Sequence, residues 1–169
     1  ASVDEAAVHL LTMSDGSDNA GAMTFGWIIS LPNGRRLARC AGPAFGPYGS
    51  SFRAEGYGFL SVARFLVRLQ EFCNQKPQWR IQMMTDNQGL LTRVETSLPF
   101  LDPFPNSTLQ TDWDITNEIN HSLQALAIPP TLIHVKGHQD DHVAYERLSL
   151  NAQLNIDADK EAGIYQQTY

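Results

Sequence analysis

Cysteine and positive charge are both scarce in this sequence. Of its 169 residues only Cys40 and Cys73 are cysteines, and they do not form a Cys-x-x-Cys pair. A disulfide scaffold needs more cysteines and a zinc ribbon needs closer pairs, so we expect two reduced thiols. Twelve Lys and Arg against eighteen Asp and Glu give a net charge of −6. Affinity for a polyanion therefore cannot rest on a broad basic surface.

Long apolar runs are also missing. No run approaches the roughly 20 residues that cross a bilayer, and the first residues lack the basic and apolar regions of a signal peptide. We therefore expect no membrane association and an intracellular location, in the nucleus or the cytoplasm. The chain is 43% hydrophobic and 18% charged, which is typical of a globular protein. Its length predicts one domain over residues 1–169.

Five segments have the apolar character of β-strands, three of them before the first long helical segment. They are residues 6–14, 22–30, 35–41, 79–85 and 131–136. The first is expected to end in a turn at Asp15-Gly16. Asn33-Gly34 separates the second from the third, which predicts a hairpin.

Helical periodicity follows in the rest of the chain. Residues 52–72 are apolar nearly all round and predict a buried helix, and Gly56 and Gly58 within it predict close packing on a neighbour. Further helices are expected from Asp86-Asn87 to about Val94, from residue 113, and over residues 149–165. Pro-rich residues 96–111 are interpreted as an insertion loop. Hairpin-linked strands followed by βα alternation predict an α/β fold with a mixed sheet.

Acidic residues fall where predicted elements begin or end. Asp15 and Asp86 follow two strands, Glu55 enters the apolar helix, and Asp157 and Asp159 enter the last helix. If the first and fourth strands are parallel neighbours, Asp15 and Asp86 lie side by side, where a cation must offset their repulsion. Oxygen ligands suit Mg²⁺ or Mn²⁺. An Asp after a strand is more often a turn residue or a helix cap, but a Glu buried without a partner is costly.

Three histidines, His134, His138 and His142, are spaced by four residues. On a helix this spacing would form a zinc-binding stripe. The segment before Gly137 has the pattern of a strand, however, so we favour His138 as a mobile general acid or proton shuttle in a polar loop. A solvated loop histidine without a role is the alternative.

Five ordered motifs resemble those of type 1 ribonuclease H. They lie at residues 14–17 (Ser-Asp-Gly-Ser), 53–55 (Arg-Ala-Glu), 85–87 (Thr-Asp-Asn), 135–138 (Val-Lys-Gly-His) and 155–162. The stretch His-Val-Lys-Gly-His-Gln-Asp-Asp is most similar to ribonuclease H domains encoded by retroelements, which are often attached to a reverse transcriptase. The resemblance implies a ribonuclease H-like fold, a five-stranded mixed sheet with its first three strands antiparallel, flanked by helices.

The resemblance also implies a function. Such enzymes cleave the RNA strand of RNA–DNA hybrids with two Mg²⁺ ions, for which Mn²⁺ can substitute. The partners implied are the hybrid and a reverse transcriptase domain in the same polyprotein. Carried over by position, the metal-binding carboxylates are Asp15, Glu55, Asp86 and Asp159. His138 matches the loop histidine that helps product leave, and Asp157, two residues early, is interpreted as a helix cap.

Substrate contacts are implied for four polar residues: Ser17, Ser50, Ser51 and Asn87. Helix capping is the alternative role for Asn87. Phe52 departs from the family pattern, which has Asn or Gln there. Residues 96–112, where some members carry a basic protrusion, contain no Lys or Arg. We therefore predict modest affinity for the hybrid and a steep dependence on salt.

Related classes are weaker fits. Proofreading exonucleases place a His five residues before the last Asp, where this chain has Leu154, and integrase cores place a Glu where it has His121. The alternative from another class is a non-catalytic ribonuclease H-like module for connection or docking. Such modules usually lose carboxylates, whereas this chain keeps all four.

Overall fold

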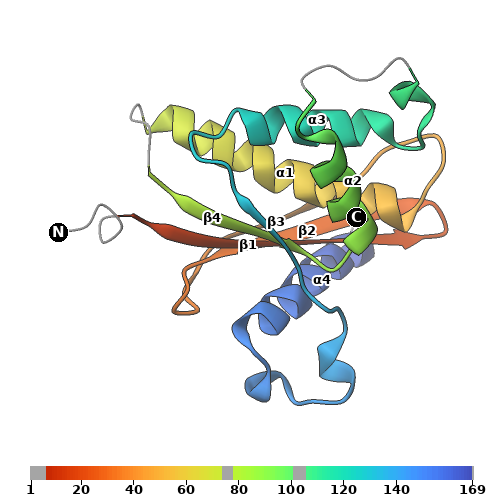
Figure 1. Ribbon diagram of the computed structural model, residues 1–169. Coiled ribbons are helices and arrows are strands. Elements are labelled where there is room, and N and C mark those ends of the chain that lie inside the picture. The colour runs from red at the N-terminus through yellow and green to blue at the C-terminus, as the bar shows by residue number, and fades with distance from the viewer. Residues whose placement is uncertain (1–6, 74–77, 101–105, 169) are drawn as a thin grey trace.

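A five-stranded mixed sheet forms the centre of the molecule (Figure 1). The computed structural model describes residues 7–73, 78–100 and 106–168. The strands are β1 (His9–Asn19), β2 (Ala22–Ser30), β3 (Arg36–Pro43), β4 (Arg80–Thr85) and β5 (Thr131–His134), and the sheet order is β3-β2-β1-β4-β5. β1, β2 and β3 are antiparallel, whereas β4 is parallel to both β1 and β5. The predicted fold class is confirmed.

Helices cover both faces of the sheet. They are α1 (Ser51–Phe72), α2 (Gln88–Ser97), α3 (Trp113–Gln124) and α4 (Leu150–Thr168), with short 3₁₀ turns η2 (Ser107–Leu109), η3 (Gln139–Asp141) and η4 (Tyr145–Arg147). α1, α2 and α3 lie on one face and α4 on the other (Figure 1). None of the helices described is both long and apolar enough to cross a membrane.

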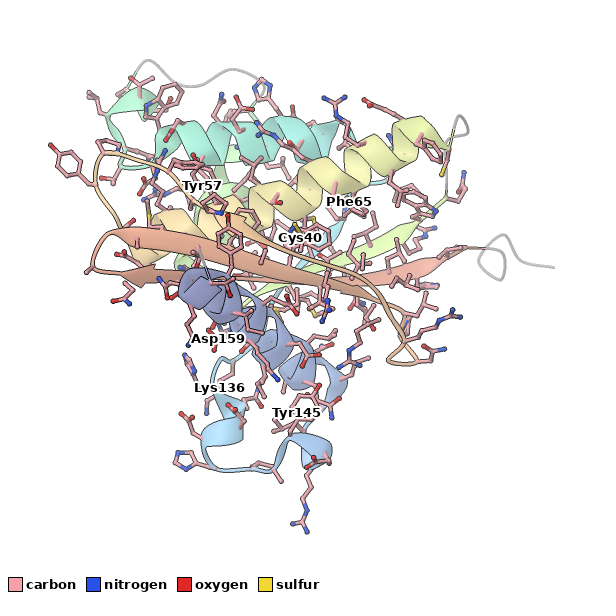
Figure 2. All side chains as sticks on the ribbon, turned by 180° about the vertical axis from the view of Figure 1, so that it is seen from behind. Cys40, Tyr57, Phe65, Lys136, Tyr145 and Asp159 are labelled. Carbon is pink, nitrogen blue, oxygen red and sulfur yellow. The ribbon has the colours of Figure 1, made fainter. Side chains whose placement is uncertain are left out.

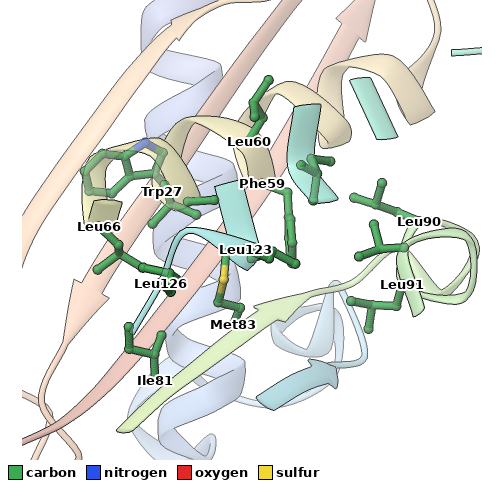
Figure 3. Close-up of a cluster of buried hydrophobic side chains, with 14 of the residues drawn as sticks. Trp27, Phe59, Leu60, Leu66, Ile81, Met83, Leu90, Leu91, Leu123 and Leu126 are labelled. Carbon is green, nitrogen blue, oxygen red and sulfur yellow. The ribbon is translucent and has the colours of Figure 1, made fainter. Parts of the chain in front are cut away.

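Two apolar layers hold the helices to the sheet because β1 and β4 are buried on both faces. The larger layer joins the sheet to α1, α2 and α3 and includes Phe59, Met83 and Leu90, none of which is exposed (Figure 3). The smaller layer packs Met13 and Leu154 between the sheet and α4. Both helix layers are thereby fixed relative to the carboxyl ends of the parallel strands.

The first strand is longer than the sequence predicts. Antiparallel pairing with β2 continues past Asp15, which lies opposite Gly26, to Asn19 opposite Ala22. Parallel pairing with β4 stops at Ser14, opposite Thr85. The predicted end of β1 at Asp15-Gly16 is therefore wrong. Asp15 instead marks the point where β1 loses its parallel neighbour and keeps only its antiparallel one.

The hairpin after β2 and the close packing of α1 agree with the sequence predictions. Gly34 has a φ of 92° in the turn between β2 and β3, which confirms the Asn-Gly hairpin. A side-chain carbon on Gly56 would lie 2.7 Å from Ile115 of α3, which confirms close packing there. The expected insertion loop at 96–111 contains the end of α2 and all of η2, and residues 101–105 lie outside the described part of the chain.

Candidate metal centre

Three carboxylates from separate elements converge at one place. Asp15 lies on β1, Glu55 in α1, and Asp86 directly after β4. One oxygen from each lies within 4.8 Å of the other two. Across the described ranges, no other three Asp, Glu, His or Cys side chains come this close. Strand order and the entry of α1 thus bring together residues up to 71 positions apart in the sequence.

Glycine allows α1 to lie directly on β1. A side-chain carbon on Gly16 would clash with the backbone of Ala54 and Glu55, including a 2.8 Å contact with the Ala54 carbonyl oxygen. One on Gly58 would lie 3.1 Å from the carbonyl oxygen of Asp15. The first turns of α1 therefore contact the strand backbone, which sets Glu55 beside Asp15.

The position of Asp86 is set from two sides. The register of β1 and β4 places it one residue beyond the last parallel pair, as Asp15 is on β1. A side-chain carbon on Gly137 would lie 2.5 Å from Asp86 Oδ2, so it would force the carboxylate to move. The ring of His134 contacts the Asp86 backbone oxygen at 3.1 Å. The segment after β5 thus packs against the carboxylate site.

The site is negative, and no basic side chain of the described residues pairs with its carboxylates. Asp15 and Glu55 are only 4% and 7% exposed. Asp15 accepts a 2.8 Å hydrogen bond from the Gly16 N–H, whereas Glu55 Oε2 is buried without a hydrogen-bond partner. Among the described residues, none of the three carboxylates takes part in an ion pair. The cluster is therefore destabilising until a cation offsets it.

Burial changes how these groups titrate. It is the main reason why the pKa of Asp15 rises to about 7, and the charges of Asp86 and Asp159 raise it further. Contacts with Glu55 and Gly16 oppose that rise. Burial, followed by the charge of Asp15, also raises the pKa of Glu55 well above its ordinary value. Near neutral pH the pair holds its charge weakly in the absence of a cation.

The two acids of α4 differ in position. Asp157 accepts hydrogen bonds from Arg36 and from the Tyr145 hydroxyl at 2.9 and 2.8 Å. It lies in the middle of α4, so its predicted role as a helix cap is wrong. The helix begins seven residues earlier than Asp157. Asp159 is exposed on α4 (Figure 2), outside the tight three-carboxylate cluster but close enough for its charge to affect Asp15.

The histidines do not form a zinc stripe. His134 ends β5, His138 precedes η3 with a φ of 54°, and the three do not form a ligand group with one another in the part of the chain that is described. The helical zinc alternative is wrong because the segment changes from a strand to a turn. His138 is exposed directly after Gly137, the residue that packs against Asp86.

The four predicted substrate contacts lie on β1 and at two helix starts. Ser50 caps α1 by accepting from the Arg53 N–H at 3.0 Å, and Asn87 caps α2 by accepting from the Leu90 N–H at 2.9 Å. The capping alternative for Asn87 is therefore confirmed. Ser51 is exposed, and the Ser17 hydroxyl donates to Gln166 of α4 at 3.2 Å.

Three residues shape the site although the sequence motifs that contain them predict no function for them. Gly16 and Gly137 are necessary for the positions of Glu55 and Asp86. Arg53, 9% exposed, pairs with Asp112 and Asp114 at 2.9 and 3.0 Å. Gly16, Gly137 and Arg53 all lie inside the quoted motifs, next to or two positions from an acid or a histidine. That adjacency is the signal by which they could have been found.

The residues fit a hard divalent cation. All three donors are carboxylates, two are buried without a counter-charge, and one oxygen of Glu55 has no partner. Mg²⁺ and Mn²⁺ prefer such oxygen ligands, whereas a zinc site would be expected to include His or Cys. Asp15, Glu55 and Asp86 are therefore the residues that would hold such an ion.

The fold of this chain matches that of solved structures, although its sequence matches no protein-family model. No protein-family model matches the chain, and neither does any curated protein sequence. Solved structures do match. Ribonuclease H1 from the halophilic archaeon Halobacterium salinarum NRC-1 is 15% identical, with a TM-score of 0.58 over 95% of this chain and 99% of its own. The chain therefore has the ribonuclease H fold.

Similarity is also found to viral domains. The ribonuclease H domain of PFV is 16% identical, with a TM-score of 0.65 over 95% of this chain and 94% of its own. Prototype foamy virus protease-reverse transcriptase is 18% identical, also with a TM-score of 0.65 over 95% of this chain. This chain spans 21% of the length of that protein. The fold is thus similar to that of both free-standing and reverse transcriptase-fused ribonuclease H domains.

Proposed function

We propose that this protein is a divalent-metal-dependent endonuclease that hydrolyses the RNA strand of RNA–DNA hybrids. The observation that carries the proposal is the convergence of Asp15, Glu55 and Asp86, with one buried oxygen of Glu55 lacking a hydrogen-bond partner and no described basic side chain paired with the three. A buried carboxylate cluster on a ribonuclease H fold is suited to phosphodiester hydrolysis, in which negative charge builds up on oxygen. LC11 ribonuclease H1, solved in complex with an RNA/DNA hybrid, matches this chain with a TM-score of 0.60 at 14% identity.

Each residue has a proposed task. Asp15, Glu55 and Asp86 hold one divalent ion, and Asp159 contributes to a second from the exposed side. When bound, the two ions act as Lewis acids toward the charges that develop on the phosphodiester. Water adds to phosphorus and the P–O3′ bond breaks, which leaves 3′-hydroxyl and 5′-phosphate ends. His138, exposed beside Asp86, exchanges a proton with the reacting groups and helps product leave.

Selectivity for a hybrid is assigned to the polar groups around the cluster. Ser51 and Ser50 at the start of α1, Asn87 at the start of α2 and Ser17 on β1 supply hydrogen bonds. Readout of 2′-hydroxyls and of backbone shape is how proteins distinguish RNA from DNA strands. The similarity to a reverse transcriptase-fused domain supports a further proposal, that this chain belongs to a retroelement polyprotein containing a reverse transcriptase.

The decisive experiment is gel analysis of an end-labelled RNA–DNA hybrid incubated with the protein. Mg²⁺, Mn²⁺ and EDTA are compared, with an RNA duplex, a DNA duplex and single-stranded RNA as parallel substrates. We expect metal-dependent internal cleavage of RNA in the hybrid alone. A folded protein that cleaves nothing with either metal would instead support the non-catalytic docking module.

An Asp86→Asn variant tests the site itself. Asn keeps the shape of the side chain but removes one ligand charge, so we expect cleavage to fall by at least about a thousandfold, a barrier increase of roughly 4 kcal/mol. Hybrid binding and the unfolding temperature should change little. Asp140→Asn, an exposed acid in η3, is the matched control. Full activity in Asp86→Asn would remove Asp86 from the metal site.

A further inference from the structure

An arginine lies over an aromatic ring at the junction of α1 and α2. The guanidinium carbon of Arg93, in α2, is 4.4 Å from the centroid of the Phe52 ring, in the first turn of α1. Both side chains are half-buried. Arg93 Nη1 also donates to the backbone carbonyl of Thr111. The stacking and the hydrogen bond hold the guanidinium in one orientation.

The two helices that carry this pair also bear on the candidate site. Phe52 follows the exposed Ser51 and precedes Glu55 by one helical turn. α2, which carries Arg93, begins at the Asn87 cap directly after Asp86. The start of α1 lies next to α2 (Figure 1). The guanidinium thus lies at the junction of the two helices whose starts carry Ser51 and Asn87, two of the proposed substrate contacts.

The charge of Arg93 is not neutralised by an acid. In the described ranges, five other arginines (Arg36, Arg39, Arg53, Arg64 and Arg68) pair with carboxylates, whereas Arg93 does not. A guanidinium has five N–H donors, and the Thr111 carbonyl uses one of those on Arg93. Among the described residues, the other N–H groups of Arg93 donate no hydrogen bond. On a chain of net charge −6, this cation is positioned to bind an anion.

We propose that Arg93, oriented by Phe52, binds a backbone phosphate of the hybrid. This inference rests on the proposed function and identifies a positive contact for the polyanionic substrate. It also explains the aromatic residue at position 52, because a flat apolar ring supports a guanidinium where an amide would compete for its hydrogen bonds. A purely structural role, in which Arg93 only joins α2 to Thr111, makes different predictions.

Arg93→Gln separates the two roles, because glutamine keeps an N–H donor for the Thr111 carbonyl and loses the charge. Binding of a fluorescent hybrid is measured by anisotropy in Mg²⁺ between 50 and 200 mM NaCl, on the Asp86→Asn background to prevent cleavage. We expect weaker binding. We also expect the slope of log K against log[NaCl] to be smaller in magnitude by about 0.9, so that the fold loss of affinity at 50 mM exceeds the fold loss at 200 mM about threefold. Arg93→Lys should keep the slope.

Two controls accompany this variant. Arg68→Gln removes an exposed charge near the far end of α1, where Arg68 pairs with Glu71, and should leave binding unchanged. Phe52→Leu keeps apolar volume but removes the ring, and should weaken binding without changing the salt slope. On the cleaving background, Arg93→Gln should raise KM and leave kcat unchanged.

The outcomes are distinguishable. A hybrid bound by Arg93→Gln with the affinity and salt slope of its parent overturns the phosphate contact and leaves the proposed function intact. Equal losses in Arg93→Gln and Arg93→Lys, with a lower unfolding temperature in both, assign Arg93 the structural role instead. No hybrid binding by the parent, together with no cleavage by the unmodified chain, overturns the proposed function itself.

Discussion

Two buried carboxylates, Asp15 and Glu55, lower the stability of the fold at the residue scale. Burying Asp15 and Glu55 together costs free energy whenever both are charged. The raised pKa values of the two groups express that cost in the folded state. A divalent ion bound by these carboxylates would remove the cost, which would link metal binding to stability.

The stability of the metal-free protein should therefore depend on the charge of Asp15. Its pKa is about 7 in the folded state against an ordinary value of 3.8. Below pH 3.8 the group is protonated in both states and contributes nothing, and its destabilising effect grows as pH rises toward 7 and is complete above. We expect Asp15→Asn to raise the metal-free unfolding temperature at pH 8 by about 5 °C and to change it little at pH 4.

Magnesium should reverse the order of the unfolding temperatures of Asp15→Asn and the unmodified protein at pH 8. At pH 8, Mg²⁺ should raise the unfolding temperature of the unmodified protein and not that of Asp15→Asn, as measured by thermal unfolding with and without EDTA. Asp140→Asn serves as the charge-matched control and should behave like the parent. An equal response to Mg²⁺ in both proteins would show that Asp15 does not hold the ion.

Gly137 sets the space for the Asp86 carboxylate, and a methyl group there should displace it. Added to Gly137, a side-chain carbon would lie 2.5 Å from Asp86 Oδ2. We expect Gly137→Ala to weaken Mg²⁺ affinity about tenfold, as changes beside a metal ligand commonly do, with cleavage reduced in parallel. Titration calorimetry measures the affinity. Gly163→Ala, which meets no atom within 4 Å, is the control and should bind Mg²⁺ normally.

Between elements, Arg53 joins three parts of the chain that are separate in sequence. From α1 it forms ion pairs with Asp112 and Asp114 at the start of α3. It also donates to the carbonyl of Phe45 in the loop before α1 and lies over the ring of Tyr57. The turn of α1 that carries Glu55 is thereby held against α3 and that loop.

Removing the Arg53 charge should destabilise the protein strongly. Arg53→Met leaves Asp112, which is 10% exposed, without its ion-pair partner, and breaking such a buried pair costs about 3 kcal/mol or more. Arg64→Met breaks a half-exposed pair with Glu118 and should cost less than about 1 kcal/mol. Urea unfolding measures both. Equal effects of the two substitutions would contradict a joining role for Arg53.

Across the whole molecule, charge limits how the protein can bind nucleic acid. Its net charge is −6, and residues 96–112 contain no Lys or Arg. We expect the isolated chain to bind a hybrid with modest affinity that falls steeply between 50 and 200 mM NaCl, because the few cationic contacts act through phosphates. Anisotropy titrations with the inactive Asp86→Asn variant measure this. Tight binding that is insensitive to salt would contradict the prediction.

Local patterns predicted most elements of the fold. Apolar runs marked all five strands and Asn33-Gly34 marked the hairpin, because these features depend on neighbouring residues. The end of β1 was mispredicted for the same reason. Asp15-Gly16 has the composition of a turn, yet pairing with β2 carries the strand on to Asn19, and a strand partner is a non-local contact.

The sequence by itself determined which chemistry is available: a set of acids at element boundaries and a histidine in a loop, in an order that resembles ribonuclease H. Only the tertiary structure decided that Asp15, Glu55 and Asp86 share one site, that Asp157 pairs instead with Arg36 and Tyr145, and that Arg93 stacks on Phe52. The physical reason is that residue type follows from the chain alone. Distance, burial and the presence of a counter-charge depend on how strands and helices pack across the sheet.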